Sequence, residues 1–456
     1  MTFIPPLDAM FLTSETREHP MHIGALHVFK LPEGAPEDYV QSLHRRLLEC
    51  TELSPLYRRK PAWPGPMTGA LRWVEERNDE VDLEYHVRLS ALPRPGRVRE
   101  LLALVAGLHS TLLDRHRPLW EFHLIEGLED NRFAVYSKMH HALTDGINGV
   151  RSTMRIMSEE PSTVLTPFWT PNLDKHPTDP APSTLSRAAE IARSVIGIGP
   201  TVTDVAVKGV WDADAALPFT APRSALNRPL TGARRFAAQS WPIARISSVA
   251  KAHGATFNDV ILAMCAGALR EYLNASEELP KKSLVSAVPV GLPRASGSEG
   301  NAVTMVLCRL ATDIADPAER LARIRASMLT AKETMRGRSA LQLSTIGMLT
   351  SIGPSALNAI PGFAATAPPP YNVVISNVPG PRNRLYWGDA EMEGWYPVSM
   401  PIEGQSLNIT VISYADTIGF GLIGCRRNVA HLQRLLGHLE DALCELEMAG
   451  AVSVPA

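Results

Sequence analysis

Two adjacent histidines, followed closely by an aspartate and a glycine, are the residues of this sequence best suited to chemistry. They are His140, His141, Asp145 and Gly146. Imidazole titrates close to neutral pH, so a histidine here could act as a general base. Neighbouring side chains on an extended strand point to opposite faces, so the two histidines cannot both reach one reacting atom. We therefore expect one active and one structural histidine.

The surrounding sequence predicts that the pair lies at the end of a strand. Residues 133–139 have the pattern of a strand, and Thr144 to Gly146 favour a sharp turn before a helix. A helical segment would instead place His141 and Asp145 on one face, where they are too few to hold a metal ion. Two structural histidines without chemistry are another alternative. Nucleophilic catalysis is disfavoured, because no Gly-x-Ser-x-Gly motif occurs and no cysteine lies near the pair.

Composition excludes several classes of protein. The chain has 456 residues, of which 45% are hydrophobic and 20% charged, with a net charge of −2. This balance gives no broad positive field, so nucleic acid is not an expected partner. The five cysteines are far apart, which fits reduced thiols in the cytoplasm and indicates neither disulfides nor a metal site. We find no signal-peptide pattern and no apolar run long enough to span a membrane.

The order of patterns predicts an α/β (α+β) protein with two domains. We expect an N-terminal domain of residues 1–160, a linker of residues 161–233 and a C-terminal domain of residues 234–456. Prolines interrupt the start of the linker, and a short amphipathic stretch, 185–198, follows them.

Periodicity and capping residues predict the individual elements of both domains. Helices are expected from Pro36, after Pro95–Gly96, over 243–253 and 256–274, from Asp316 and over 431–448. Strands are expected over 119–125, 132–140, 235–240, 284–290, 371–376, 407–414 and 418–424.

One long segment has no charged side chain. Residues 339–381 contain no Asp, Glu, Lys or Arg, but glycines and prolines break the segment too often for a spanning helix. It could form core helices and strands. Alternatively, residues 346–363 could present an apolar surface to lipid or line a channel for an acyl chain.

The histidine motif resembles the HHxxxDG motif of a large acyltransferase superfamily that includes chloramphenicol acetyltransferase and peptide-synthetase condensation domains. Further segments, in matching order along nearly the whole chain, resemble the bacterial wax ester synthase/diacylglycerol acyltransferase family. They are Leu7–Leu12, Pro118–Trp120, Asn258–Asp259, Ser376–Pro381 and Leu407–Ile409 leading to Ser413–Tyr414. The sequence departs from the family pattern at Pro289–Arg294, which puts the role of Arg294 in doubt.

The resemblance implies a fold and a reaction. The fold would be two chloramphenicol-acetyltransferase-like domains with mixed sheets flanked by helices, the catalytic histidine lying at their interface in a channel. Acyl-CoA would be the donor, and diacylglycerol, a long-chain alcohol or both the acceptor, with no metal or cofactor. Because lipid acceptors are poorly soluble, we expect a cytoplasmic protein associated peripherally with a membrane or a lipid inclusion.

The resemblance also suggests roles for individual residues. His141 would be the general base, Asp145 would hold the loop, Gly146 would leave room for substrate, and His140 would be structural. Ser376 and Asn377 are candidates to stabilise negative charge, or they are simply the end of a strand that turns through Pro379–Pro381. Asn258 and Asp259 could shape the site or cap a helix, and Pro118 and Trp120 could fix the hairpin and wall the channel. Two alternative functions remain, namely a condensation-type enzyme that uses carrier-bound acyl groups and a catalytically idle lipid-inclusion protein.

Overall fold

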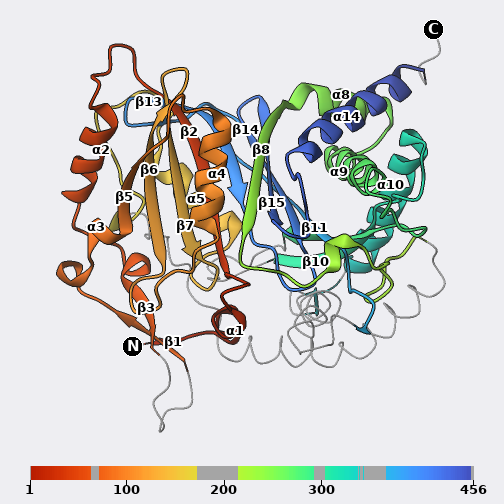
Figure 1. The fold of residues 1–456 in the computed structure, drawn as a ribbon, viewed down its shortest axis with the longest axis horizontal. Helices are drawn as coiled ribbons and strands as arrows, with labels where there is room; N and C mark the ends of the chain where they lie inside the picture. Colours follow the sequence, from red (N-terminus) through yellow and green to blue (C-terminus); the bar gives the residue numbers. More distant parts are fainter. Residues whose placement is uncertain are drawn as a thin grey trace.

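The computed structural model contains two six-stranded mixed sheets that lie side by side (Figure 1). It describes residues 2–62, 71–171, 214–291, 303–336, 338, 342–343 and 366–452. The predicted α/β class is confirmed. The amphipathic stretch 185–198 and most of the uncharged segment lie outside the described residues.

The N-terminal lobe is built around the sheet of order β12-β13-β2-β7-β6-β5, with a small sheet β1-β4-β3 beside it. Its first two strands in this order are β12 (Tyr386–Trp387) and β13 (Ala390–Val398). Its elements are β1 (Thr2–Phe3), α1 (Pro6–Ser14), β2 (His22–Lys30), α2 (Tyr39–Leu48), η1 (Pro55–Arg58), β3 (Arg59–Ala62), β4 (Arg72–Glu75), η2 (Asn78–Glu80), α3 (Leu83–His86), β5 (Val87–Ala91), α4 (Val98–His109), β6 (Trp120–Leu128), β7 (Arg132–His140) and α5 (Gly146–Ile156). The predicted β6–β7 hairpin is confirmed, and β2 pairs with β7 along its whole length, with His22 opposite His140.

The C-terminal lobe has the sheet order β10-β9-β11-β14-β15-β8. Its elements are η4 (Ala225–Asn227), β8 (Arg234–Pro242), α8 (Ile243–Ala252), α9 (Phe257–Asn274), β9 (Val285–Gly291), β10 (Val303–Arg309), α10 (Pro317–Met335), β11 (Val373–Val378), β14 (Leu407–Tyr414), β15 (Thr417–Cys425) and α14 (Arg434–Val452). Helices α8, α9, α10 and α14 gather on the outer side of this sheet (Figure 1). Every element that the sequence predicted in this half is present, with ends shifted by a few residues.

Two helix starts show why the sequence folds locally as predicted. At α9, the Thr256 side chain accepts the backbone N–H of Asp259, whose carboxylate accepts the N–H of Thr256 in return. At α10, Asp316 accepts the N–H of Glu319, and Pro317 occupies the first turn. Such caps satisfy backbone donors that the helix itself leaves unpaired.

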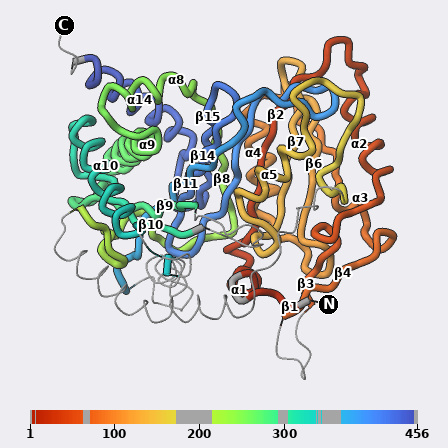
Figure 2. Tube along the Cα trace, turned by 180° about the vertical axis from the view of Figure 1, so that it is seen from behind, coloured from red at the N-terminus to blue at the C-terminus, as the bar shows by residue number. Residues whose placement is uncertain are grey.

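The two sheets do not divide along the chain as the expected domains do. Strands β12 (Tyr386–Trp387) and β13 (Ala390–Val398) follow β11 in the sequence, yet β13 pairs antiparallel with β2 of the N-terminal lobe. Figure 2 shows this blue part of the chain passing into the red and orange lobe. Phe168 and Trp169, assigned to the linker from sequence, are buried in the same lobe. Residues 386–398 therefore belong with the N-terminal sheet.

Part of the uncharged segment belongs to the core. Its last residues form β11, in which Val373 and Ile375 are buried between neighbouring strands. No helix among the described residues combines the length and the apolar character needed to cross a bilayer.

β13 crosses β15 of the other sheet so closely that the two backbones are in contact. A Cβ on Gly419 would lie 2.1 Å from the carbonyl oxygen of Trp395, and one on Gly421 would lie 1.8 Å from that of Pro397. These distances are impossible for real side chains, so the crossing requires glycine at both positions of β15.

Gly421→Ala is expected to destabilise the protein strongly. The added methyl group would collide with a backbone carbonyl rather than a movable side chain, so the free energy of unfolding should fall by about 2–3 kcal/mol or more. Gly437→Ala on α14, where a Cβ would meet no atom within 4 Å, is the matched control and should raise stability by about 0.5–1 kcal/mol. Urea unfolding measures both values, and equal effects would contradict the proposed close contact.

Candidate active site

The histidine motif lies where β7 ends, as predicted. His140 is the last residue of β7, residues 141–145 form a loop, and α5 begins at Gly146. Asp145 caps this helix, with its carboxylate accepting the N–H of Asn148 at 2.7 Å. The motif therefore places one histidine inside the sheet and the next in the loop that follows it.

His140 is enclosed by the protein. Its side chain is fully buried, Nδ1 accepts the N–H of Ala142 at 3.1 Å, and Nε2 lies 3.6 Å from the carboxylate of Glu15. Burial lowers the pKa of His140 to about 3, with smaller contributions from His141 and Arg115. A neutral ring that organises the loop backbone fits the structural role expected for it.

His141 is half-buried and held on two sides. Its ring stacks on Phe11 of α1 with centroids 4.2 Å apart, and its backbone N–H donates to the carbonyl oxygen of Met21 at 2.8 Å. Nδ1 is enclosed and has no hydrogen-bond partner on another described residue. Nε2 likewise makes no hydrogen bond within the described ranges.

Electrostatics keep the His141 ring neutral. Burial lowers its pKa, while a hydrogen bond to its own backbone and the charge of Asp145 raise it to a smaller extent. If Nδ1 carries the proton in that backbone contact, the lone pair is on Nε2. His141 is therefore arranged as a base near neutral pH.

The contacts of Asp145 support an architectural role. Its side chain is buried at the start of α5. Burial raises the pKa of the nearby Asp8, and the charge of Asp145 adds to that rise. Gly146 is exposed, and a Cβ there would meet no protein atom within 4 Å. No neighbouring protein atom therefore requires glycine at this position, and the expected approach of substrate to Gly146 stays a prediction.

Sequence reasoning did not identify Glu15 and Arg115, which fix the segment next to the motif. The Glu15 carboxylate accepts the N–H of Met21 at 2.9 Å and pairs with the Arg115 guanidinium at 2.9 Å. Arg115 also donates to the carbonyl oxygen of Leu12 at 2.8 Å. Phe11 lies in the Leu7–Leu12 segment that resembles the family, so the sequence did indicate that this part of α1 matters. Glu15 and Arg115 are 100 residues apart, and no local pattern joins them.

The candidate residues of the C-terminal lobe form a second group. The Asn377 amide donates to the Asn258 side chain at 3.4 Å, which joins the end of β11 to the start of α9. Ser376 pairs in register with Thr410 of β14. Asp259 serves the capping box of α9, which is the helix-cap alternative considered from sequence. Neither Asn258 nor Asn377 hydrogen-bonds His141 in the part of the chain that the structure describes.

The turn after β11 explains two further motif segments. Gly380 donates its N–H to the Ser413 hydroxyl at 3.0 Å, and a Cβ on Gly380 would lie 2.0 Å from the carbonyl oxygen of Ser413. The Tyr414 hydroxyl bridges the backbone of Leu385 and Met392. The Ser376–Pro381 and Ser413–Tyr414 segments therefore pack on each other and hold β11, β14 and β13 together.

Trp120 lies in the core of the N-terminal lobe. Its indole donates to the carbonyl oxygen of Tyr57 at 2.8 Å, and its ring stacks on His86 with centroids 4.3 Å apart. These contacts fix the hairpin, as one of its two expected roles required. Pro118 lines a separate polar cavity of about 490 Å³ together with Glu76, Glu80, Asp82, His86, Asp114, His116 and Arg117. Among the described residues, no group of three His, Cys, Asp or Glu could hold a metal ion.

Two family profiles match almost the whole chain. Residues 4–261 match the wax ester synthase/diacylglycerol acyltransferase catalytic domain, and residues 299–447 match the C-terminal domain of the same family.

Full-length relatives carry consistent names. A Mycobacterium tuberculosis protein named as a diacylglycerol O-acyltransferase is 48% identical, covering 97% of this chain and 99% of its own. O-acyltransferase WSD of Acinetobacter baylyi is 38% identical, covering 96% and 95%. A solved wax ester synthase/diacylglycerol acyltransferase from Marinobacter aquaeolei VT8 has 41% identity and a TM-score of 0.81, covering 99% and 100%. The first condensation domain of the CDA synthetase, at 15% identity and a TM-score of 0.59, shares the fold alone.

Replacing Glu15 with glutamine is expected to loosen the segment that holds the histidine motif. The neutral amide removes a charge-assisted contact from the partly buried Arg115, so the free energy of unfolding should fall by about 2–3 kcal/mol. Asp38→Asn, which breaks the exposed pair with Arg45, is the control and should cost under about 1 kcal/mol. Urea denaturation followed by tryptophan fluorescence compares the two, and a loss for Glu15→Gln as small as that of the control would show that the buried pair holds nothing.

Proposed function

The chain belongs to the wax ester synthase/diacylglycerol acyltransferase family and is an O-acyltransferase, and we propose that His141 is its general base. The reaction moves an acyl group to the hydroxyl of diacylglycerol, of a long-chain alcohol or of both, with acyl-CoA as the proposed donor. The observation that carries the assignment is the half-buried ring of His141, neutral, fixed by Phe11 and Met21, with Nε2 free.

The proposed mechanism uses that lone pair directly. Nε2 takes the proton of the acceptor hydroxyl as its oxygen attacks the thioester carbonyl carbon, which gives a tetrahedral intermediate. Collapse of the intermediate breaks the carbon–sulfur bond, and the imidazolium returns the proton to the departing CoA sulfur. The products are the ester and free CoA. These proposed reaction steps use no metal or cofactor, and acyl-CoA is a co-substrate.

Other residues support the reaction without moving the proton. Asp145 fixes the loop by capping α5, and Gly146 leaves space beside it. The negative charge on the intermediate needs a hydrogen-bond donor, and we propose Asn377, or Ser376 beside it, as the donor from the C-terminal lobe. Asn258 orients the Asn377 amide. We propose that substrates reach His141 through a channel between the lobes.

Relatives that are 38–48% identical over almost the whole chain carry the names of O-acyltransferases. That agreement favours lipid acyl transfer over both a carrier-dependent condensation enzyme and an idle lipid-inclusion protein. The similarity in fold to condensation domains does not distinguish lipid acyl transfer from carrier-dependent condensation, because it shows the architecture alone.

Loss of the base should stop the reaction without unfolding the protein. We expect His141→Ala to release CoA thiol from palmitoyl-CoA about 10²–10⁴-fold more slowly with diacylglycerol or hexadecanol present, at an unchanged melting temperature. His116→Ala, an exposed histidine of the same lobe, is the control and should keep full turnover. Because the pKa of His141 is lowered from 6.5, the acid-side fall in wild-type turnover should lie below that pH.

Three results would contradict these assignments. Full turnover in His141→Ala would end the assignment of the base. Activity with a pantetheinylated carrier but not with CoA would favour the condensation alternative. Lipid binding without thiol release from any donor would favour the idle protein.

We also propose that the protein works at the surface of a membrane or lipid inclusion, on its cytoplasmic side. The support is the insolubility of the acceptors and the uncharged sequence of residues 339–381, most of which lies outside the described residues. Apolar contact strengthens or persists as salt rises, whereas attraction between charges is screened.

A flotation experiment tests this association. Mixed with phosphatidylcholine vesicles that contain diacylglycerol, the protein should float with the lipid in both 0.1 M and 1 M NaCl. Release at high salt would point to charge in place of apolar contact, and protein that stays at the bottom of the gradient under both conditions would contradict the proposal.

A further inference from the structure

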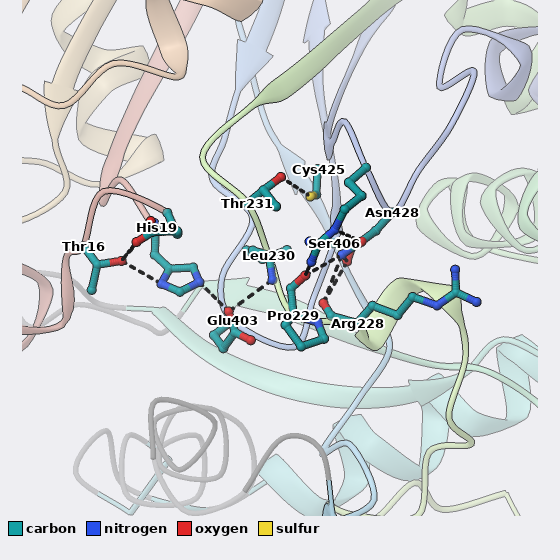
Figure 3. Close-up of polar contacts among 12 residues, drawn as sticks. Thr16, His19, Arg228, Pro229, Leu230, Thr231, Glu403, Ser406, Cys425 and Asn428 are labelled. Atoms are coloured by element: carbon teal, nitrogen blue, oxygen red, sulfur yellow. Dashed lines mark hydrogen bonds and ion pairs between the residues drawn. The ribbon is translucent and has the colours of Figure 1, made fainter. Parts of the chain in front are cut away.

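The turn of residues 16–19 contacts the C-terminal lobe, where the His19 ring meets Glu403 (Figure 3). The backbone closes the turn, since Thr16 and His19 each donate an N–H to the other's carbonyl oxygen, at 3.2 and 3.1 Å. His19 Nδ1 lies 2.9 Å from the Thr16 hydroxyl, and Nε2 contacts the carboxylate of Glu403. The His19 and Glu403 side chains are only 18% and 17% exposed.

Glu403 is rigidly held by its own lobe. It lies in the tight turn 402–405 between β13 and β14, where Gly404 has a φ of +77° and accepts a hydrogen bond from the Asn227 amide at 2.8 Å. The Glu403 carboxylate also accepts the N–H of Leu230 at 3.4 Å. The C-terminal lobe therefore holds the Glu403 carboxylate through Leu230 and the backbone of its turn through Asn227.

A second set of contacts packs the same turn against residues 231–234. The Arg234 guanidinium donates to the carbonyl oxygen of Glu18 at 2.5 Å, and a Cβ on Gly232 would lie 3.1 Å from the carbonyl oxygen of Arg17. The turn 16–19 thus sits directly on the C-terminal lobe, although the chain around it belongs to the other lobe.

A short and stiff piece of chain connects this turn to the catalytic loop. Pro20 follows His19, so its own φ is fixed and the backbone of His19 is restricted to extended conformations. The next residue, Met21, accepts the backbone N–H of His141 at 2.8 Å. From His19 to Met21 the chain spans at most about 7 Å, so a shift of the His19 side chain is passed to His141 with little loss.

We infer that His19 and Glu403 are positioning residues, which set the place of His141 relative to the C-terminal lobe and its candidate oxyanion donors. The inference rests on the proposed function of His141. Misplacing a catalytic group by about 1 Å can cost about 100-fold in rate. The pair should therefore act on the turnover number more than on substrate binding.

Substitution of His19 by asparagine or by glutamine tests its two side-chain contacts separately. The amide nitrogen of asparagine takes the place of Nδ1 and keeps the contact with Thr16, whereas that of glutamine takes the place of Nε2 and reaches Glu403. We expect His19→Asn to lower kcat at least about tenfold with KM for both substrates within about twofold, and His19→Gln to stay within about threefold of the wild type. Combining His19→Asn with Glu403→Ala should give no further loss, since both changes remove one interaction.

Tyr396→Phe is the matched control. It removes another hydrogen bond between the two sheets, that from the Ser240 hydroxyl at 3.2 Å, and it leaves both the backbone ladder of β13 and the contact between His19 and Glu403 unchanged. Its kcat should equal that of the wild type. If His19→Asn does not fold, Glu403→Gln and Glu403→Ala provide the same comparison, because only glutamine keeps an acceptor for His19.

Equal kcat in the asparagine and glutamine variants, or a loss confined to KM or to melting temperature, would overturn the inference. His141→Ala is assayed beside them. If that variant is active, the proposed base is wrong, whereas an inactive His141→Ala with a fully active His19→Asn rejects the positioning role alone.

Discussion

The close crossing of β13 over β15 is the constraint on which the arrangement of the two lobes depends. β13 pairs within the N-terminal sheet, and its backbone also contacts β15 of the other sheet. That contact requires glycine at positions 419 and 421. β13 pairs with β2, and β2 pairs with β7 so that His22 lies opposite His140. The hydrogen-bond ladder therefore runs from the crossing to the catalytic loop across three strands. If one sheet moved relative to the other, this ladder would transmit the shift to β7, which ends one residue before His141.

Burial and anchoring together explain how His141 can act as a base. A ring that is partly removed from water gives up its charged form readily, so it stays neutral at a pH where an exposed histidine would begin to protonate. The neighbours of this loop add no unpaired charge to it. His140 is neutral because burial lowers its pKa, and the Glu15 carboxylate pairs with Arg115. The Asp145 carboxylate accepts a backbone N–H of α5, and its charge raises the pKa of His141 to a smaller extent than burial lowers it.

How much could be predicted from sequence depended on whether the signal was local. The caps at Thr256 and Asp316, the hairpin before His140 and the strand-loop-helix context of Asp145 were predictable because each is set by residues close together in the chain. Strand β13 and its place beside β2 were not, because residues 390–398 and 22–30 meet only through the fold. For the same reason the sequence pointed to His141 and Asp145 but not to Glu15 and Arg115. Trp120, which the resemblance marked as a possible channel wall, is held in the core by Tyr57 and His86, a packing that depends on distant partners.

Two physical routes therefore connect the C-terminal lobe with the catalytic histidine, and they differ in stiffness. The ladder from β13 through β2 to β7 consists of repeated backbone hydrogen bonds, so it sets the position of β7 as a whole. The route through Glu403, His19 and Met21 passes through one side-chain contact and reaches the backbone of His141 itself. The first route fixes the strand, but the loop beyond its end is free to move unless something holds it. The second route supplies that restraint from the lobe that carries Asn377, the candidate donor to the oxyanion. Base and donor must keep one separation during the reaction, and a direct contact between their supports achieves this better than rigidity of either lobe alone.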